Sequence, residues 1–297
     1  MKKVAILMST YNGDKYIVKQ LDSIYNQTFK NIKVFIRDDG SDKSFIEKLN
    51  QLKEKYDFEL VLGKNIGFVG SFFELLESAQ GFDLYSFADQ DDYWFPHKIE
   101  LAVKWFEKYG DENTPMLFHS AYNNMDVNTG KTHLFYFPNK SYSFRRSITE
   151  NHYSGFSMTI NSKMRDYMLL GDYTKIGYHD WWAAMIAHSL GKGYSDGRVM
   201  AIHYTHGKNY TTFNIKTRFE WLIQNIKKKS DISCRTKEFY NCFGDRLKEP
   251  DRRMLELFVF DKYDLFKSIK KAFYVHRWRP IISSEIVIRM LMLIGRI

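Results

Sequence analysis

Three aspartates fall within four positions of the segment SFADQDDYWFP, residues 86–96: Asp89, Asp91 and Asp92. Like charges this close repel one another, so the cluster costs free energy unless a positive partner lies in it. Two carboxylates one residue apart can hold Mg²⁺ or Mn²⁺ while water and diphosphate oxygens complete the coordination. Such a cation would neutralise a departing diphosphate. The alternatives are a solvated acidic turn, or Asp92 as the N-cap of the next helix.

The glycine-rich loops that bind phosphate in many nucleotide-binding proteins are absent from this sequence. It contains neither GxxxxGK[ST] nor GxGxxG, and Gly63, Gly67 and Gly70 have the wrong spacing. A nucleotide would therefore need another counter-charge for its phosphates. Asp89 and Asp91 can supply one through a divalent cation.

Hydrophobic periodicity indicates the elements that would position the aspartates. Strands are predicted at 2–9, 31–39, 58–63 and 83–90, and helices follow them at about 14–26, 43–56, 67–79 and 98–109. This alternation predicts an open, mostly parallel α/β sheet with flanking helices. Ligands bind such sheets beyond the carboxyl ends of the strands. The segments STYNG, RDDGS and ADQDD are expected to meet there.

Beyond residue 115 the pattern is less regular. We expect a strand at 115–126, a loop at 131–150, a helix opened by Asp180, a strand at about 198–207, and basic helices from about 215. Residues 215–297 hold 19 Lys and Arg against 10 Asp and Glu, whereas residues 1–214 hold 25 of each. The whole net charge of +9 therefore lies in the tail, which predicts a domain at 1–214 and a separate helical region at 215–297.

Composition narrows the class of protein. Hydrophobic residues make up 44% and aromatic residues 17% of the 297 residues, enough for a substantial core. The two cysteines, Cys234 and Cys242, fit no metal or disulfide pattern, so a reducing compartment is expected. The first apolar stretch is too short for a signal peptide. The sequence contains no run of ~18 apolar residues, so no membrane-spanning helix is expected.

Six segments together resemble glycosyltransferase family 2, which has the GT-A fold, over residues 1 to about 215. They are ILMSTYNGDKYIVKQLDSIYNQTF, IRDDGSDKS, NIGFVGSFFELL, FADQDDYWFPHKI, SGFSMTIN and HDWW, in the order and spacing of that family. DQDDYW and HDWW most resemble the bacterial branch that adds rhamnose or related sugars to cell-surface polysaccharides.

The resemblance implies a nucleotide site at the strand ends. Its residues here would be Ser9, Tyr11, Asp38, Asp39, Asn65, Gly67 and Asp89. The chemistry agrees, because a tyrosine ring offers a stacking face and a carboxylate accepts from the N3–H of uracil or thymine. Strand-end packing for Tyr11, a structural turn for Asp38 and an ordinary loop at Asn65 are the alternatives.

The resemblance also implies a metal site made by Asp89, Asp91 and His206, with Asp91 as the more direct ligand. An imidazole ligand favours Mn²⁺ over Mg²⁺. His203 is a second, less supported candidate. The sequence departs from the branch at Tyr204, where relatives tend to have an arginine.

In the family, the position matching Asp180 is the general base that deprotonates the acceptor hydroxyl. A single base with no nucleophile implies inversion at the anomeric carbon. The alternative is that Asp180 only caps the helix, in which case His179 is the next candidate base. Trp181 or Trp182 would either lie under a sugar ring or pack in the core.

The basic tail indicates a membrane surface more than nucleic acid. Ile282, Ile286, Met290 and Leu293 fall on one helical face, and a basic amphipathic helix of this kind binds anionic membranes. Docking on the catalytic domain and a homo-oligomer interface are the alternatives.

We therefore expect an inverting, metal-dependent glycosyltransferase in the cytoplasm, on the inner face of the cell membrane. It would use a UDP- or dTDP-sugar and extend a lipid-linked surface glycan, with no role for nucleic acid. The rival hypotheses are a sugar nucleotidyltransferase, and an inactive glycan-binding or scaffold protein.

Overall fold

The computed structural model describes residues 1–139, 142–205, 231–260 and 262–297. The strands are β1 Val4–Thr10, β2 Ile32–Asp38, β3 Phe58–Leu62, β4 Leu84–Asp89, β5 Tyr93–Trp94, β6 Met116–Asp126, β7 Thr132–Phe135, β8 Met158–Asn161 and β9 Lys192–Thr205. The helices are α1 Ile17–Tyr25, α2 Lys43–Leu52, α3 Gly67–Ser78, α4 Lys98–Tyr109, α5 Phe144–Thr149, α6 Ser162–Met168, α7 Tyr173–Ile176, α8 His179–Ser189, α10 Asp231–Phe243, α11 Glu249–Glu256, α12 Leu265–Ala272 and α13 Ile282–Leu293.

One mixed sheet organises the molecule, in the order β3-β2-β1-β4-β8-β6-β9-β5, with β7 added to β6. β1, β2, β3 and β4 are parallel, as predicted, and β8 pairs antiparallel with both β4 and β6. Because β1, β2 and β4 run in one direction, their carboxyl ends with Thr10, Asp38 and Asp89 lie at one edge. The predicted meeting of the three polar segments is confirmed.

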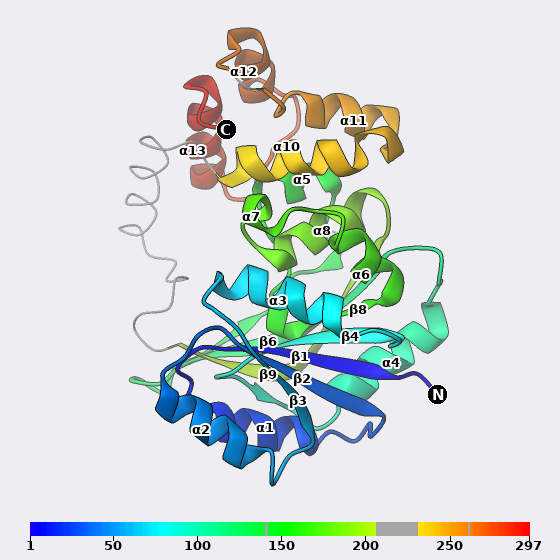
Figure 1. Ribbon diagram of the computed structural model, residues 1–297. Coiled ribbons are helices and arrows are strands. Elements are labelled where there is room, and N and C mark those ends of the chain that lie inside the picture. The colour runs from blue at the N-terminus through cyan, green and yellow to red at the C-terminus, as the bar shows by residue number, and fades with distance from the viewer. Residues whose placement is uncertain (140–141, 206–230, 261) are drawn as a thin grey trace.

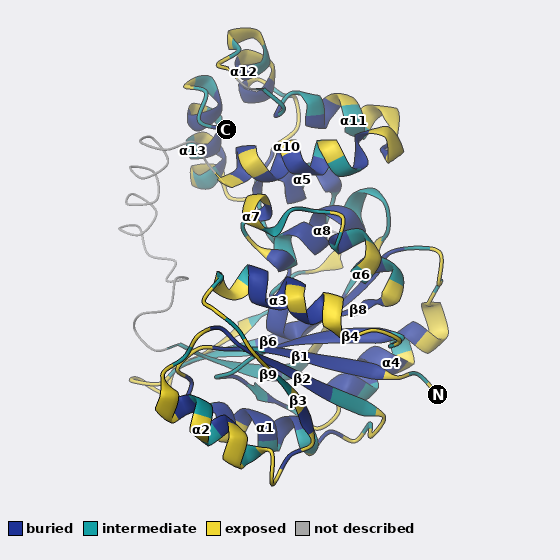
Figure 2. Ribbon diagram, viewed as in Figure 1, coloured by how far each residue is buried: buried dark blue, intermediate teal, exposed yellow. Residues whose placement is uncertain are grey.

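Side chains that alternate along β1 supply two cores. Val4, Ile6 and Met8 pack with α1, α2 and α4 on one face, and Ala5 and Leu7 pack with α3 and α8 on the other. Figure 1 shows α1 and α2 on one side of the sheet and α3, α6 and α8 on the other. Figure 2 shows the central strands as buried. The sheet therefore holds the strand ends rigidly between two helical layers.

Several boundaries differ from the expectations. α1 begins at Ile17 instead of Asp14, because Tyr16 and Ile17 both donate their N–H groups to the Gly13 carbonyl in a tight turn. The expected loop at 131–150 contains β7 and α5. β7 forms because it pairs with β6 over Tyr122–Met125, a long-range contact that local composition does not reveal.

The C-terminal helices pack on the same layer as α8. Phe239 of α10 contacts Trp182 of α8, and Trp278 and Ile288 belong to the same buried cluster. Figure 1 shows α10, α11, α12 and α13 above α5 and α8. The predicted boundary at 214/215 lies outside the described residues. The described helices after this boundary share one continuous core with α5, α6 and α8, which come before it.

The C-terminal helices also expose a set of apolar side chains, which we call the C-terminal apolar face. It consists of Phe266, Ile269, Phe273, Val275, Ile282, Ile286 and Met290. Phe273 is 74% exposed and Ile286 55% exposed. The opposite side of α13 is buried through Ile288, Leu291 and Met292. Ile282, Ile286 and Met290 of the predicted helix face thus point to solvent, whereas Leu293 of that face packs against the core.

Candidate active site

Two backbone loops at the strand ends are tied together by the side chain of Gln90. Its amide Oε1 accepts from the Tyr11 N–H, and its Nε2 donates to the Tyr11 carbonyl, both at 3.0 Å. A Cβ on Gly13 would lie only 2.2 Å from the same Oε1, so this close approach requires glycine. Gln90 therefore fixes the loop after β1 to the acidic turn after β4. The sequence analysis assigned it no role.

Asp38 organises the neighbouring turn. Its Oδ1 accepts from the Ser41 N–H at 2.8 Å, and its Oδ2 accepts from the hydroxyl groups of Ser41 and Thr10 at 2.5 and 3.1 Å. Asn12, at φ +46°, donates its N–H to the Ser41 hydroxyl. The predicted nucleotide residue Asp38 is thus buried among structural hydrogen bonds.

Asp39 is also buried, and it anchors the start of α3. Its carboxylate pairs with the Arg37 guanidinium at 2.6 Å and accepts from the N–H groups of Ile66 and Gly67, both at 2.9 Å. Apart from its chain neighbours and its own helix, no atom of the described residues lies within 4 Å of where a Gly67 Cβ would be, so space is open on this side of Gly67. Asp39 thereby holds the Gly67 backbone at the strand edge.

The other predicted nucleotide residues occupy the same edge. Tyr11 exposes half of its surface, and its backbone is held by Gln90. The Ser9 hydroxyl donates to the Ser71 hydroxyl at 2.8 Å. Asn65 is exposed on the loop that precedes α3. These positions leave Tyr11 and Asn65 accessible to a nucleoside.

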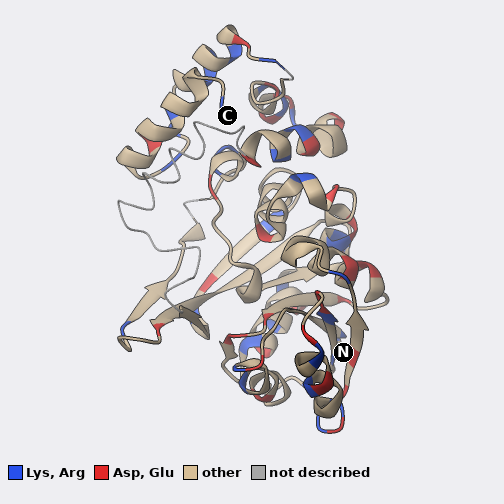
Figure 3. Ribbon diagram, turned by 60° about the vertical axis from the view of Figure 1, so that its left-hand side comes forward, with Lys and Arg blue, Asp and Glu red and all other residues tan. Residues whose placement is uncertain are grey.

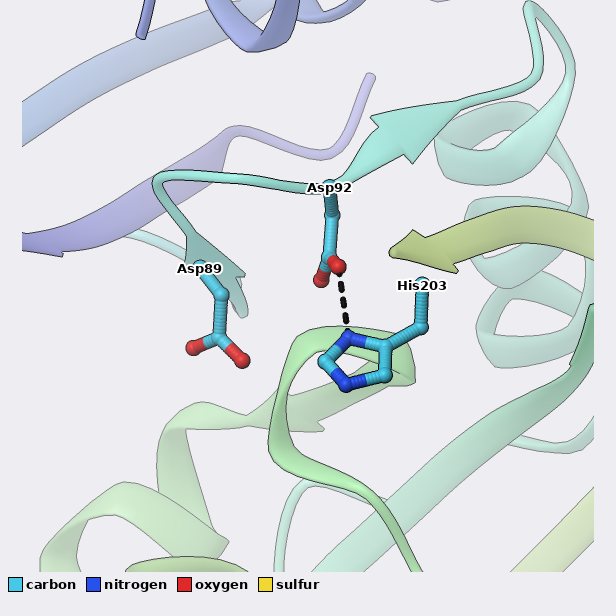
Figure 4. Close-up of side chains that lie close together, drawn as sticks. All are labelled: Asp89, Asp92 and His203. Atoms are coloured by element: carbon cyan, nitrogen blue, oxygen red, sulfur yellow. Dashed lines mark hydrogen bonds and ion pairs between the residues drawn. The ribbon is translucent and has the colours of Figure 1, made fainter. Parts of the chain in front are cut away.

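A carboxylate–imidazole group lies beside this edge and consists of Asp89, Asp92 and His203. Each residue offers one ligand atom, and these atoms lie within 4.8 Å of one another. Figure 4 shows Asp89 and His203 on either side of Asp92, with the His203 Nδ1 2.7 Å from the Asp92 Oδ1. The pairing of β5 with β9, Tyr93 opposite Ile202, brings the two sequence-distant segments together.

The pKa values of these three residues are raised, which indicates that a positive charge is favoured among them. Burial raises the pKa of Asp89 well above its usual range, and the charges of Asp92 and Asp91 raise it further. Burial raises the pKa of Asp92 to about 6. Burial disfavours the charged form of His203, but the charge and hydrogen bond of Asp92 raise its pKa to about 9.

The donor set fits a divalent cation. Among the described residues, the Asp92 Oδ2 is buried and accepts no hydrogen bond, which leaves a desolvated acceptor without a partner. Two carboxylates and an imidazole match the ligand preference of Mn²⁺. The predicted ligand Asp91 is half-buried in the same turn but outside this group. His206 lies outside the described residues.

Asp180 sits in the first turn of α8, whose N-cap is Tyr178, so the expectation that Asp180 opens the helix is wrong by one residue. Its carboxylate accepts from the Trp181 N–H at 2.7 Å and from the Gly155 N–H at 3.3 Å. Burial raises the pKa of Asp180 to about 6 although these hydrogen bonds lower it. Its charge also raises the pKa of Asp89, and the residue before it, His179, packs on Phe87 of β4, two residues before Asp89.

His179 packs in the core beside this carboxylate. Its ring lies 4.4 Å from the Phe72 ring and 5.0 Å from the Phe87 ring, measured between centroids. Burial lowers the pKa of His179 to about 3, so the imidazole is neutral at physiological pH. Asp180 is the more accessible of the two candidate bases.

A family model, "Glycosyl transferase family 2", matches residues 5–168, more than half of the chain. The chain belongs to glycosyl transferase family 2. The matched range contains the Gln90 contact, the acidic turn and the start of α3. The enzyme class predicted from the sequence, a glycosyltransferase, is thereby confirmed.

Two relatives of this glycosyltransferase have named activities. The dTDP-rhamnosyl transferase RfbG of Shigella flexneri is 30% identical over 102 residues, which cover 32% of this chain and 35% of that protein. The UDP-Glc:alpha-D-GlcNAc-diphosphoundecaprenol beta-1,3-glucosyltransferase WfaP of Escherichia coli is 32% identical over 110 residues, 36% of this chain and 42% of WfaP. The chain thus matches less than half the length of either relative.

Solved structures share the fold of the glycosyltransferase. S. aureus TarS 1–349 in complex with UDP has a TM-score of 0.55 at 14% identity and covers 99% of this chain and 90% of that chain. The mannosyltransferase PcManGT from Pyrobaculum calidifontis, in complex with GDP-Man and Mn²⁺, has a TM-score of 0.54 at 13% identity and covers 86% and 68%. The predicted GT-A fold is confirmed.

None of the helices in the part of the glycosyltransferase that the structure describes combines the length and apolar composition needed to cross a bilayer.

Proposed function

We propose that the chain is an inverting, metal-dependent glycosyltransferase that moves a sugar from a UDP- or dTDP-sugar to a hydroxyl of a lipid-linked surface glycan. The observation that carries this proposal is that the Asp89–Asp92–His203 group lies at the end of β4, the strand on which His179, the residue before Asp180, packs through Phe87. RfbG supports rhamnose as the first donor to test, and WfaP supports a diphospholipid acceptor.

Each group has a defined task in this proposal. Asp89, Asp92 and His203 hold the cation, which when bound supplies positive charge to the diphosphate leaving group. Tyr11 and the backbone at Gly67 contact the nucleoside, at positions fixed by Gln90 and Asp39. The Asp180 carboxylate removes the proton of the acceptor hydroxyl as the new C–O bond forms. With no second nucleophile, the anomeric carbon is attacked once, which inverts its configuration.

A donor panel tests the reaction class. UDP- and dTDP-sugars with Mn²⁺ should raise the unfolding temperature, because a ligand at a hundredfold excess over its Kd stabilises the folded state by about 2.7 kcal/mol. The same donors with EDTA in place of Mn²⁺ are the control and should stabilise much less. Stabilisation by a nucleoside triphosphate and a sugar phosphate, with none by any diphospho-sugar, would instead favour the nucleotidyltransferase.

We also propose that the C-terminal apolar face binds an anionic membrane on the cytoplasmic side. Lys262, Lys270 and Arg277 are exposed among its apolar side chains, and residues 262–297 hold eight Lys and Arg against two Asp and Glu. Figure 3 shows basic segments between the uncharged ones on the C-terminal helices. Exposed apolar area next to cations matches the chemistry of an anionic lipid surface.

Point substitutions test this membrane contact without damaging the core. The triple variant Phe266→Ser, Phe273→Ser and Ile286→Ser should lose cosedimentation with vesicles that contain anionic lipid, and donor hydrolysis should stay near wild type. Truncation of the tail is unsuitable, since Ile288 and Leu291 on the buried side of α13 belong to the core. High salt should weaken wild-type binding, because charge attraction is screened over ~8 Å at physiological ionic strength.

The matched control replaces three exposed apolar residues elsewhere: Tyr109→Ser, Leu134→Ser and Leu170→Ser. It should bind vesicles as the wild type does. If the test variant keeps its vesicle binding but changes from an oligomer to a monomer in sedimentation, the C-terminal apolar face is a subunit interface.

A further inference from the structure

The two tryptophans that follow Asp180 are covered by other parts of the protein. Trp182 is fully buried, and its indole N–H donates to the Met168 carbonyl at 3.2 Å. Trp181 is half-buried, its indole N–H donates to the Ser147 carbonyl, and the Arg235 guanidinium lies over its ring at 3.5 Å. Of the two roles left open by the sequence for these tryptophans, a place under a sugar ring and core packing, the contacts of both side chains fit packing.

Phe68 and Tyr178 form a different aromatic pair at the same place. Phe68 lies in the first turn of α3 and is 48% exposed, and Tyr178 immediately precedes α8 and is 42% exposed. Their ring centroids are 5.8 Å apart at an angle of 45°. Two large aromatic rings, from elements about 110 residues apart in the chain, thus present a joint exposed surface two residues before Asp180.

Hydrogen bonds fix the backbone at both residues, and a ring contact supports Phe68. The Asp39 carboxylate fixes the N–H of Gly67, the residue before Phe68, and the Phe68 ring meets the buried His179 ring edge-on at 6.2 Å. The Tyr178 backbone donates to the Ile176 carbonyl and accepts from the Trp182 N–H. The exposed surface is therefore preorganised, which lowers the entropic cost of binding a ligand there.

We propose that Phe68 and Tyr178 form the platform on which a pyranose ring of the acceptor lies, next to the hydroxyl that Asp180 deprotonates. This assignment rests on the proposed function. The C–H face of a pyranose is apolar and packs on an aromatic ring, while its hydroxyl groups stay free for polar partners. The exposed ring of Tyr11 lies directly after β1, in the loop bonded to Gln90, and suits the base instead.

The platform is tested by acceptor kinetics with octyl pyranosides of glucose, N-acetylglucosamine, galactose and rhamnose, using the one that the wild type turns over fastest. Phe68→Ala and Tyr178→Ala should each raise the acceptor KM by about tenfold, the size expected for loss of an aromatic contact. Donor KM and donor hydrolysis should change less than about twofold. Phe68→Trp and Tyr178→Phe should restore the acceptor KM, because the ring and not the hydroxyl makes the contact.

Tyr109→Ala, an exposed tyrosine on α4, is the matched control and should leave both KM values unchanged. A rise in donor KM with an unchanged acceptor KM would overturn the platform and make Phe68 and Tyr178 nucleotide contacts. Unchanged kinetics in both alanine variants would also overturn it, as would wild-type donor hydrolysis with no transfer to any pyranoside. Absence of donor hydrolysis in the wild type would instead refute the proposed function itself.

Discussion

Asp180→Asn is expected to lower sugar transfer at least a hundredfold while donor affinity stays near that of the wild type. The substitution removes a proton acceptor, and general base catalysis is typically worth ~10²–10⁴ in rate. Asparagine keeps one oxygen, which can accept from the Trp181 N–H as the Asp180 Oδ1 does at 2.7 Å, and loses only the longer contact of the Oδ2 with the Gly155 N–H at 3.3 Å, so the fold should tolerate it. Transfer rate and donor affinity, by calorimetry, are measured on one preparation. Transfer within a few fold of wild type would leave Asp180 as a purely structural residue.

The pH dependence of transfer gives the same hypothesis a second readout. Burial raises the pKa of Asp180 to about 6, and only the ionised form can accept a proton. Transfer by the wild type should therefore fall as the pH drops through about 6, about tenfold per unit once the carboxyl is protonated. The residual activity of Asp180→Asn should lack this decline.

His179 is a poor substitute for Asp180. Its ring is enclosed by Phe72, Phe87 and Gly155, where a Cβ on Gly155 would lie 2.4 Å from the His179 Nε2. An acceptor hydroxyl cannot reach this nitrogen without displacing core aromatic rings. The sequence placed both residues at the helix start, but only the packing shows which one remains accessible.

Asp92→Asn is expected to weaken Mn²⁺-dependent binding of a nucleoside diphosphate by ~100-fold or more and to abolish transfer. The Asp92 Oδ2 is buried with no hydrogen-bond partner among the described residues, and its Oδ1 orients His203. An amide in its place would bring N–H donors toward the cation. Calorimetric titration with Mn²⁺ and nucleoside diphosphate measures the loss, and circular dichroism verifies the fold.

Asp91→Asn is the matched variant in the same turn. It removes an equal charge from a half-buried neighbour, so it should reduce metal-dependent binding much less than Asp92→Asn. The opposite order, a severe loss with Asp91→Asn and a mild one with Asp92→Asn, would support the ligand set inferred from family resemblance, in which Asp91 is the more direct ligand.

The parts of the site that follow from local pattern were predictable from the sequence. The continuous apolar run from Val4 to Met8 indicates a strand buried on both faces by helices, and parallel strands then bring Asp38 and Asp89 to one edge. Such inferences need only the side-chain period of a strand and the rule that ligands bind at strand ends.

The partners of Asp92 and Gln90 could not be derived in this way. His203 is 111 positions from Asp92, and their contact depends on β5, a strand of two residues that pairs with β9. The Gln90 side chain hydrogen-bonds to the backbone of Tyr11 and not to a side chain there, so no side-chain pairing in the sequence points to it. Likewise, periodicity found the apolar side of α13 at Ile286 but could not tell whether packing covers it.

In the function that we propose, the Gln90 contact would couple two binding equilibria, that of the cation and that of the nucleotide. The turn that carries Asp89 and Asp92 is joined through one amide to the backbone of Tyr11, so a cation that orders the turn also restricts the loop that meets the nucleoside. The second ligand then binds a segment whose conformational entropy is already reduced. Because such coupling is thermodynamically reciprocal, cation and nucleotide should raise each other's affinity by the same factor. Neutralisation of the diphosphate charge by the cation is a separate source of cooperativity that does not need Gln90. The part of the cooperativity that comes from ordering the loop depends on Gln90.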